Sequence, residues 1–244
     1  MVFISYTSNY IEGFTIWNIN QLPICIGNRY TYSKNKNGGH NMEYSAGITS
    51  ERWYQQDIEY VLALLEKGLS REEIREIVLN ENPFLVKTES ALQKRFQLAY
   101  KRAISLTNEL RSYYLSGTKY DQKALILYTF LKTYRYAYES LYELIIYRYQ
   151  QKNKQLVLAH LESFMEEKEQ QSKKIANWSI VSKKRINNTL LLLYKTSGII
   201  DLSESIYTIA PLHVSPQLKE YAFKNDPLLT AIITLQVGGN IDDL

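Results

Sequence analysis

Residues 178–210 read WSIVSKKRINNTLLLLYKTSGIIDLSESIYTIA. Ser182 is a typical helix N-cap, and the apolar residues after it repeat at spacings of three and four, which predicts a helix over 183–196. A glycine ends this helix, and two short strands, 199–202 and 206–210, follow around a polar turn. A capped helix followed by a small hairpin is typical of a winged helix-turn-helix.

The predicted helix 183–196 has a basic side. Lys183, Lys184 and Arg185 occupy its expected first turn, where cations oppose the helix dipole unless an anion such as phosphate lies nearby. Lysine and arginine suit phosphate contacts, and an asparagine amide can bond adenine bidentately. The residues that we expect to contact duplex DNA are Lys183, Lys184, Arg185, Asn187, Asn188 and Lys195. A solvated basic surface is the alternative.

A second candidate DNA-binding unit lies upstream. Helical stripes over 54–66, over the segment that Ser70 and Glu73 cap, and over a third helix opened by Thr88 or Ser90 outline a helix-turn-helix. The third helix exposes Lys94, Gln97 and Lys101, with Arg95 and Arg102 on one flank. The second helix carries Glu72, Glu73 and Glu76, which would repel a phosphate backbone. A purely structural role would account for the residues of this unit equally well.

The middle of the chain predicts a helical bundle. Residues 121–149 carry apolar side chains over most of a helical circumference, which places one long helix at the centre, and 155–174 predict another helix. The many tyrosines have core spacing rather than the pattern of base-stacking platforms. The fold class is therefore mainly α: an N-terminal helix-turn-helix region (42–110), a central helical bundle (111–174) and a winged helix-turn-helix-like region (175–244).

Residues 1–41 differ from the rest of the chain. They contain Cys25 and a Gly/Asn/Lys-rich stretch, and they lack a helical period. The codons of Gly38 and Gly39 can spell the core of a ribosome-binding site at a natural distance before Met42. We therefore expect residues 1–41 to be a translated leader and Met42 the true start. A β-rich or disordered extension is the alternative.

Composition excludes several classes of protein. One cysteine rules out a disulfide framework, and three scattered histidines rule out a Cys/His zinc cluster, so we expect no metal and no cofactor. No stretch approaches the roughly 20 apolar residues of a membrane span.

Glycine-rich phosphate loops and nucleophile motifs are missing, which argues against an enzyme and a small-molecule substrate. A net charge of +4 gives no general basic excess, so nucleic-acid binding would depend on local clusters. We expect a cytoplasmic protein.

Several motifs resemble a known family. Tyr44–Thr49 (YSAGIT), Leu65–Ser70 (LEKGLS), Glu81–Phe84 (ENPF) and Lys87–Ser90 (KTES) look like the start of BrxA, a helical component of bacterial BREX (bacteriophage exclusion) systems. Trp178-Ser179 before a basic helix is similar to that family's second helix-turn-helix. The resemblance covers about residues 43–235. It implies an all-α fold, DNA binding without known catalysis, and a role beside a methyltransferase-centred complex that excludes phage.

The sequence thus supports one function hypothesis and two rivals. The first is a non-catalytic protein of phage defence that binds double-stranded DNA, mainly through phosphates, together with other BREX subunits. The rivals are a scaffold that docks defence subunits and a helical bundle that binds RNA.

Overall fold

The computed structural model describes residues 24–26, 29–31, 43–203 and 206–237. Residues 1–41 and 42–244 form two compact units. In the first unit, β1 (Ile24–Ile26) pairs antiparallel with β2 (Arg29–Thr31). The described part of the second unit is mainly helical, which confirms the mainly α class; the helix-turn-helix and winged helix-turn-helix assignments stay predictions. The proposal that residues 1–41 are a leader stays a prediction.

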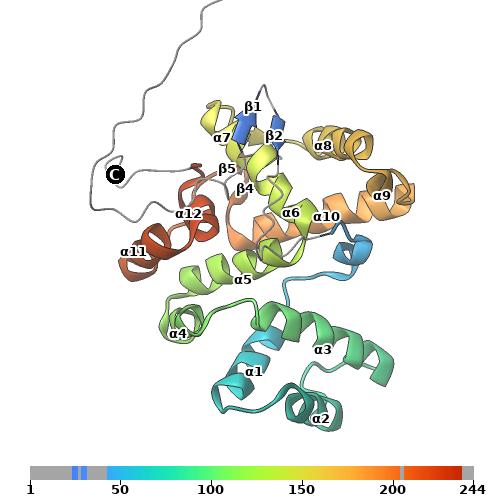
Figure 1. Ribbon diagram of the computed structural model, residues 1–244, viewed down its shortest axis with the longest axis vertical. Helices are drawn as coiled ribbons and strands as arrows, with labels where there is room; N and C mark the ends of the chain where they lie inside the picture. Colours follow the sequence, from blue (N-terminus) through green and yellow to red (C-terminus); the bar gives the residue numbers. More distant parts are fainter. Residues whose placement is uncertain (1–23, 27–28, 32–42, 204–205, 238–244) are drawn as a thin grey trace, which may run out of the picture. The chain divides into compact units, whose positions relative to one another are not determined.

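The second unit begins with a group of three helices. Its elements are the 3₁₀ helix η2 (Ala46–Ser50), α1 (Gln55–Glu66), α2 (Arg71–Glu81) and α3 (Glu89–Ala103). Ser70 and Glu73 cap α2 reciprocally, as predicted: the Ser70 amide donates to Glu73 Oε2 at 2.8 Å, and the Glu73 amide donates to Ser70 Oγ at 3.3 Å. Both α1 and α2 pack against α3 (Figure 1).

The centre of the bundle is not one long helix, so the prediction for 121–149 was wrong. The structure has α4 (Asn108–Ser116), α5 (Lys119–Thr133), α6 (Arg135–Ser140), the π-helical turn η3 (Leu141–Ile146) and α7 (Tyr147–Gln150). Tyr134 interrupts the run with extended backbone (φ −126°, ψ 115°). Its hydroxyl donates to Glu51 Oε1 at 2.7 Å, a contact between distant segments that local periodicity does not encode. The core position of α5 is as expected, since it contacts α3, α4, α10 and α12 (Figure 1).

The C-terminal part surrounds a small sheet. Its elements are β3 (Gln155–Leu156), α8 (Leu158–Gln171), α9 (Lys173–Ala176), α10 (Ile180–Ser197), β4 (Ile200–Ser203), β5 (Ile206–Ile209), α11 (Pro216–Asn225) and α12 (Pro227–Thr234). The predicted helix over 155–174 was wrong at its start, because Gln155 and Leu156 pair with β5 as a third strand. The predicted hairpin is present: β4 and β5 are antiparallel, with Ile200 opposite Ile209.

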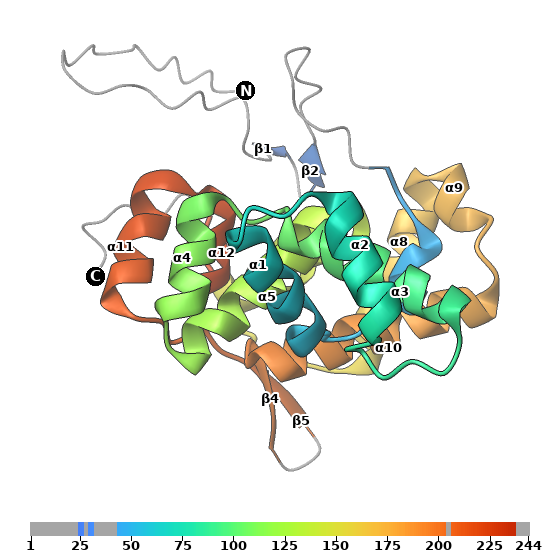
Figure 2. The same ribbon diagram turned by 90° about the horizontal axis from the view of Figure 1, so that it is seen from below.

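The hairpin β4–β5 projects from the body beside α10 (Figure 2). Gly198 ends α10 with a left-handed backbone (φ +91°), a conformation that glycine adopts without steric cost, and this turn directs the chain into β4. Among the described helices, none has both the length and the apolar character that crossing a membrane demands.

Candidate nucleic-acid interface

Helix α10 is fixed to the core by its inner face. Ile186, Leu190 and Leu193 are fully buried, as the predicted stripe requires. Tyr194 is also buried, and its hydroxyl lies 2.6 Å from Ser140 Oγ on α6. The opposite face of α10 is therefore held in a defined orientation toward solvent.

The start of α10 differs from the prediction. The N-cap is Ser179, whose Oγ accepts from the Ser182 amide at 3.1 Å, so the helix begins at Ile180 rather than Lys183. Lys183 to Arg185 consequently lie in the second turn, beyond the free amide groups of the helix end. The expected opposition between these cations and the helix dipole was wrong, because that effect is confined to the first turn.

Four of the six candidate residues share the solvent face of α10. Lys184, Arg185, Asn188 and Lys195 are exposed. Within residues 43–203 and 206–237, no carboxylate forms an ion pair with any of the three cations. Residues three or four positions apart lie on one helix face, so 184, 188 and 195 form a strip with a positive charge at each end.

The other two candidates are engaged within the protein. Lys183 Nζ pairs with Glu169 Oε2 at 2.9 Å and donates to the Ala176 carbonyl at 3.2 Å. Asn187 is only 4% exposed. Its Oδ1 accepts from the Tyr136 hydroxyl at 3.4 Å, and its Nδ2 donates to the Leu161 carbonyl at 3.3 Å. Asn187 cannot reach a base edge, and we correct its assignment to a core residue that joins α10 to α6 and α8.

The structure also shows apolar side chains on this face that the sequence reasoning missed. Ile180 is 84% exposed, Val181 60% and Leu192 46%. The signal in the sequence was a pair of apolar residues after Ser179, which is also a good N-cap. A helix that begins after Ser182 does not include this pair, so the prediction did not place Ile180 and Val181 beside the cations.

The exposed side of α3 carries the second set of candidates. Lys94, Gln97 and Lys101 are all exposed, although Lys101 Nζ lies 5.3 Å from the centre of the Tyr134 ring. The flanking arginines are engaged with other groups of the protein. Arg95 forms a two-pronged ion pair with Asp57, and Arg102 is fully buried, so their expected phosphate-facing position was wrong.

Arg102 is the centre of a buried polar cluster. Its guanidinium lies 3.4 Å from Glu51 Oε2 and donates to the Arg52 carbonyl at 2.9 Å, the Ile126 carbonyl at 2.8 Å and Thr129 Oγ1 at 3.1 Å. Burial raises the pKa of the Glu51 carboxyl, and Arg102 and the Tyr134 hydroxyl offset part of that rise. The cluster joins the segment before α1 to α3 and α5, which supports a structural role.

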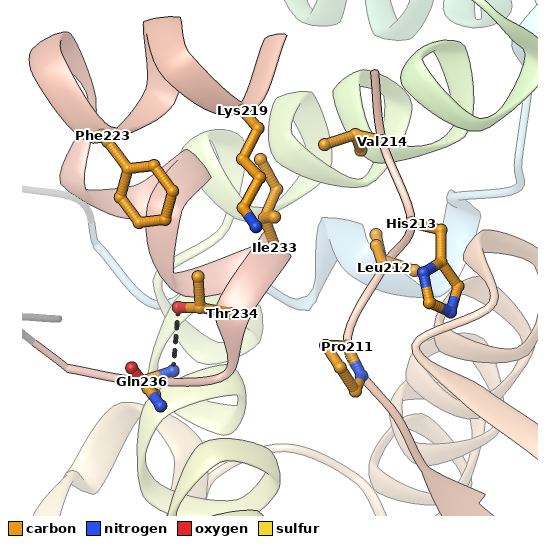
Figure 3. Close-up of a pocket in the computed structure, with 9 residues that line it drawn as sticks. All are labelled: Pro211, Leu212, His213, Val214, Lys219, Phe223, Ile233, Thr234 and Gln236. Atoms are coloured by element: carbon orange, nitrogen blue, oxygen red, sulfur yellow. Dashed lines mark hydrogen bonds between the residues drawn. The ribbon is translucent and has the colours of Figure 1, made fainter. Parts of the chain in front are cut away.

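A pocket of about 300 Å³ lies between residues 211–214 and helices α11 and α12 (Figure 3). Its lining is mostly apolar, and His213 and Lys219 are its ionisable side chains. The hydroxyl of Thr234 donates its proton to the Thr230 carbonyl, not to a basic side chain that could activate it as a nucleophile. No group of His, Cys, Asp and Glu suited to a metal ion occurs in the part of the chain that the structure describes.

Two comparisons with known proteins indicate the same family. A family model described as BrxA matches residues 42–226. "BREX protein BrxA" from Bacillus cereus (strain H3081.97) is 30% identical over 136 residues, which are 56% of this chain and 68% of that protein. A crystal structure of an uncharacterised protein from Magnetospirillum magneticum is similar with a TM-score of 0.67 and 13% identity, covering 79% of this chain and 99% of that one. The last likeness concerns the fold alone.

Proposed function

The chain belongs to the BrxA family, and from this premise we propose that it is a non-catalytic, DNA-binding component of a bacteriophage exclusion (BREX) system. The name of the Bacillus cereus relative supports the place in BREX. The observation that supports DNA binding is the strip of unpaired cations on α10. In this proposal the protein acts in the cytoplasm, where the DNA of the host and of the phage is found.

Charge and geometry make duplex DNA the partner that fits α10 best. Lys184, Arg185 and Lys195 project from one rigid helix, whereas Lys183 and Lys174 are neutralised by Glu169 and Glu43. A single α-helix fits the major groove of DNA, and cations along it neutralise phosphates on the groove edges. The hairpin β4–β5 beside α10 would then approach the backbone next to that groove.

The exposed side of α3 would supply a second contact. Lys94, Gln97 and Lys101 lie on one face at spacings of three and four, and a glutamine amide can serve either a phosphate or a base.

Salt-dependent binding tests the proposal. We expect the triple variant Lys184→Ala/Arg185→Ala/Lys195→Ala to bind every duplex sequence more weakly. The slope of log K against log salt should flatten by about 0.9 for each phosphate that the variant no longer neutralises. Thermal stability should stay near that of the wild type, because surface substitutions of this kind usually change stability by less than about 0.5 kcal/mol each.

A matched control removes the same charge elsewhere. Lys67→Ala/Arg75→Ala/Lys119→Ala also deletes three exposed cations, from the C-cap of α1 and the surfaces of α2 and α5. It should leave the salt slope unchanged. Equal slopes for the wild type and the α10 variant would refute the assignment of the interface, and tighter binding of a matched RNA duplex would favour the RNA-binding alternative.

A protein-docking role for the N-terminal helices has its own support. Glu72, Glu73 and Glu76 are exposed on α2, and Leu85, which follows the C-terminal end of this helix, is 88% exposed. Leu85 has a left-handed backbone (φ +53°), which is costly for a leucine and is held in place by hydrogen bonds between Asn82 and Val86. The exposed carboxylates of α2 and the exposed leucine after it suit a basic protein partner such as another BREX subunit. Leu85→Ser should weaken capture of that partner without changing DNA affinity.

A further inference from the structure

Ile180 and Val181 are an unusual feature of the first turn of α10. Both are strongly exposed, at 84% and 60%, although burial of such side chains is normally favourable. Both are branched at Cβ, so their χ1 angles are restricted within a helix. The Ser179 cap fixes the turn that carries them. The protein thus presents two rigid apolar groups to solvent at the start of its basic helix.

The surroundings of this pair indicate what would cover it. Ile180 lies four residues before Lys184, and Val181 lies four residues before Arg185, so each apolar side chain is adjacent to a cation on the helix surface. An apolar protein surface would have to bury these two charges without a partner, at considerable cost. A polyanion that also displays apolar groups can neutralise the cation and cover the apolar side chain of each pair.

The major groove of DNA has this combination. Phosphates line its edges, and each thymine displays a C5-methyl group on its floor. In helix-turn-helix proteins the N-terminal residues of the recognition helix contact base edges. Resting on the proposed binding of DNA by α10, we propose that Ile180 and Val181 contact thymine methyl groups and give the protein a preference for A·T pairs. Asn188, further along the same face, is placed to bond the adenines of such pairs.

Removing the methyl groups from the DNA tests the proposal directly. Binding is measured to two A·T-rich duplexes of identical sequence, one of which has deoxyuridine in place of every thymine. The wild-type protein should bind the deoxyuridine duplex about fourfold more weakly for each methyl group that it can no longer bury, the value of burying one carbon. Ile180→Ala/Val181→Ala removes most of the apolar side-chain surface, so it should discriminate clearly less between the two duplexes, with an unchanged salt slope because Lys184 and Arg185 remain.

Val157→Ala/Leu158→Ala is the matched control. It removes another adjacent pair of exposed apolar residues, Val157 at 42% and Leu158 at 43%, which lie at the N-terminal end of α8. This variant should discriminate between the duplexes as the wild type does.

The outcomes separate the two proposals. If the wild type binds both duplexes equally and tightly, DNA binding stands and recognition of the methyl groups is refuted. Recognition of the methyl groups is also refuted if Ile180→Ala/Val181→Ala discriminates like the wild type, a result that would assign the apolar pair to a protein partner. If the wild type binds neither duplex, the proposed function itself fails.

Discussion

Replacing Arg102 with methionine should lower the free energy of unfolding by about 3–5 kcal/mol. This is the range for removing one partner of a buried ion pair while the other stays in place. Methionine can fill the space of the aliphatic stem, but it has no donors. The carboxylate of Glu51, itself fully buried, would keep the hydroxyl of Tyr134 as its hydrogen-bond donor and lose its counter-ion. The carbonyls of Arg52 and Ile126 would each lose a donor as well.

The size of this effect makes it measurable by urea denaturation. The free energy of unfolding of such a domain is about 5–15 kcal/mol in total. The variant should therefore remain folded at low temperature but lose a large part of this free energy. The melting temperature should fall by roughly 6–20 °C, at about 2–4 °C for each kcal/mol. Arg102→Met/Glu51→Gln should be more stable than Arg102→Met alone, because the unpaired buried charge is gone.

The pH dependence provides a second measurement. Burial already raises the folded-state pKa of Glu51 above its ordinary value of 4.5, and removal of Arg102 raises it further. A carboxyl with a raised folded pKa stabilises the fold below its unfolded pKa, and that stability is lost as pH rises through the folded pKa. Arg102→Met should therefore be destabilised less at about pH 5 than at about pH 8. A destabilisation under about 1 kcal/mol, independent of pH, would refute the reasoning.

Three further predictions concern stability. Leu131→Ala and Leu141→Ala each create a cavity at a fully buried position, so chemical denaturation should show losses of about 2–5 kcal/mol for each. Ser179→Ala should cost about 1 kcal/mol and Ser182→Ala clearly less, since the first is the observed cap of α10; the reverse order would contradict the helix start described above. A chain that begins at Met42 should melt within about 2 °C of the full chain by calorimetry, and a cooperative loss of stability would show that residues 1–41 belong to the fold.

The parts of the structure that follow from local chemistry could be read in the sequence. The capping box of Ser70 and Glu73, the glycine that ends α10 and the buried stripe of that helix depend on residues at most a few positions apart. Periodicity and capping act within one or two helical turns, and the mainly α fold and the exposed basic face follow from them. The resemblance to the BrxA family also came from short local motifs, Tyr44–Thr49, Leu65–Ser70, Glu81–Phe84 and Lys87–Ser90 in combination, and the family match confirms it.

Other features arise from contacts between residues far apart in the chain. Tyr134 breaks the central run where its hydroxyl meets Glu51, and the Leu156 strand forms because β5 lies beside it. Arg102 and Asn187 are polar residues on helices, and a helical wheel assigns such residues to solvent. Only the packing of α3 and α10 against other helices surrounds them with partners and buries them. The energy of a buried polar group depends on neighbours from other segments, and local sequence does not contain this information.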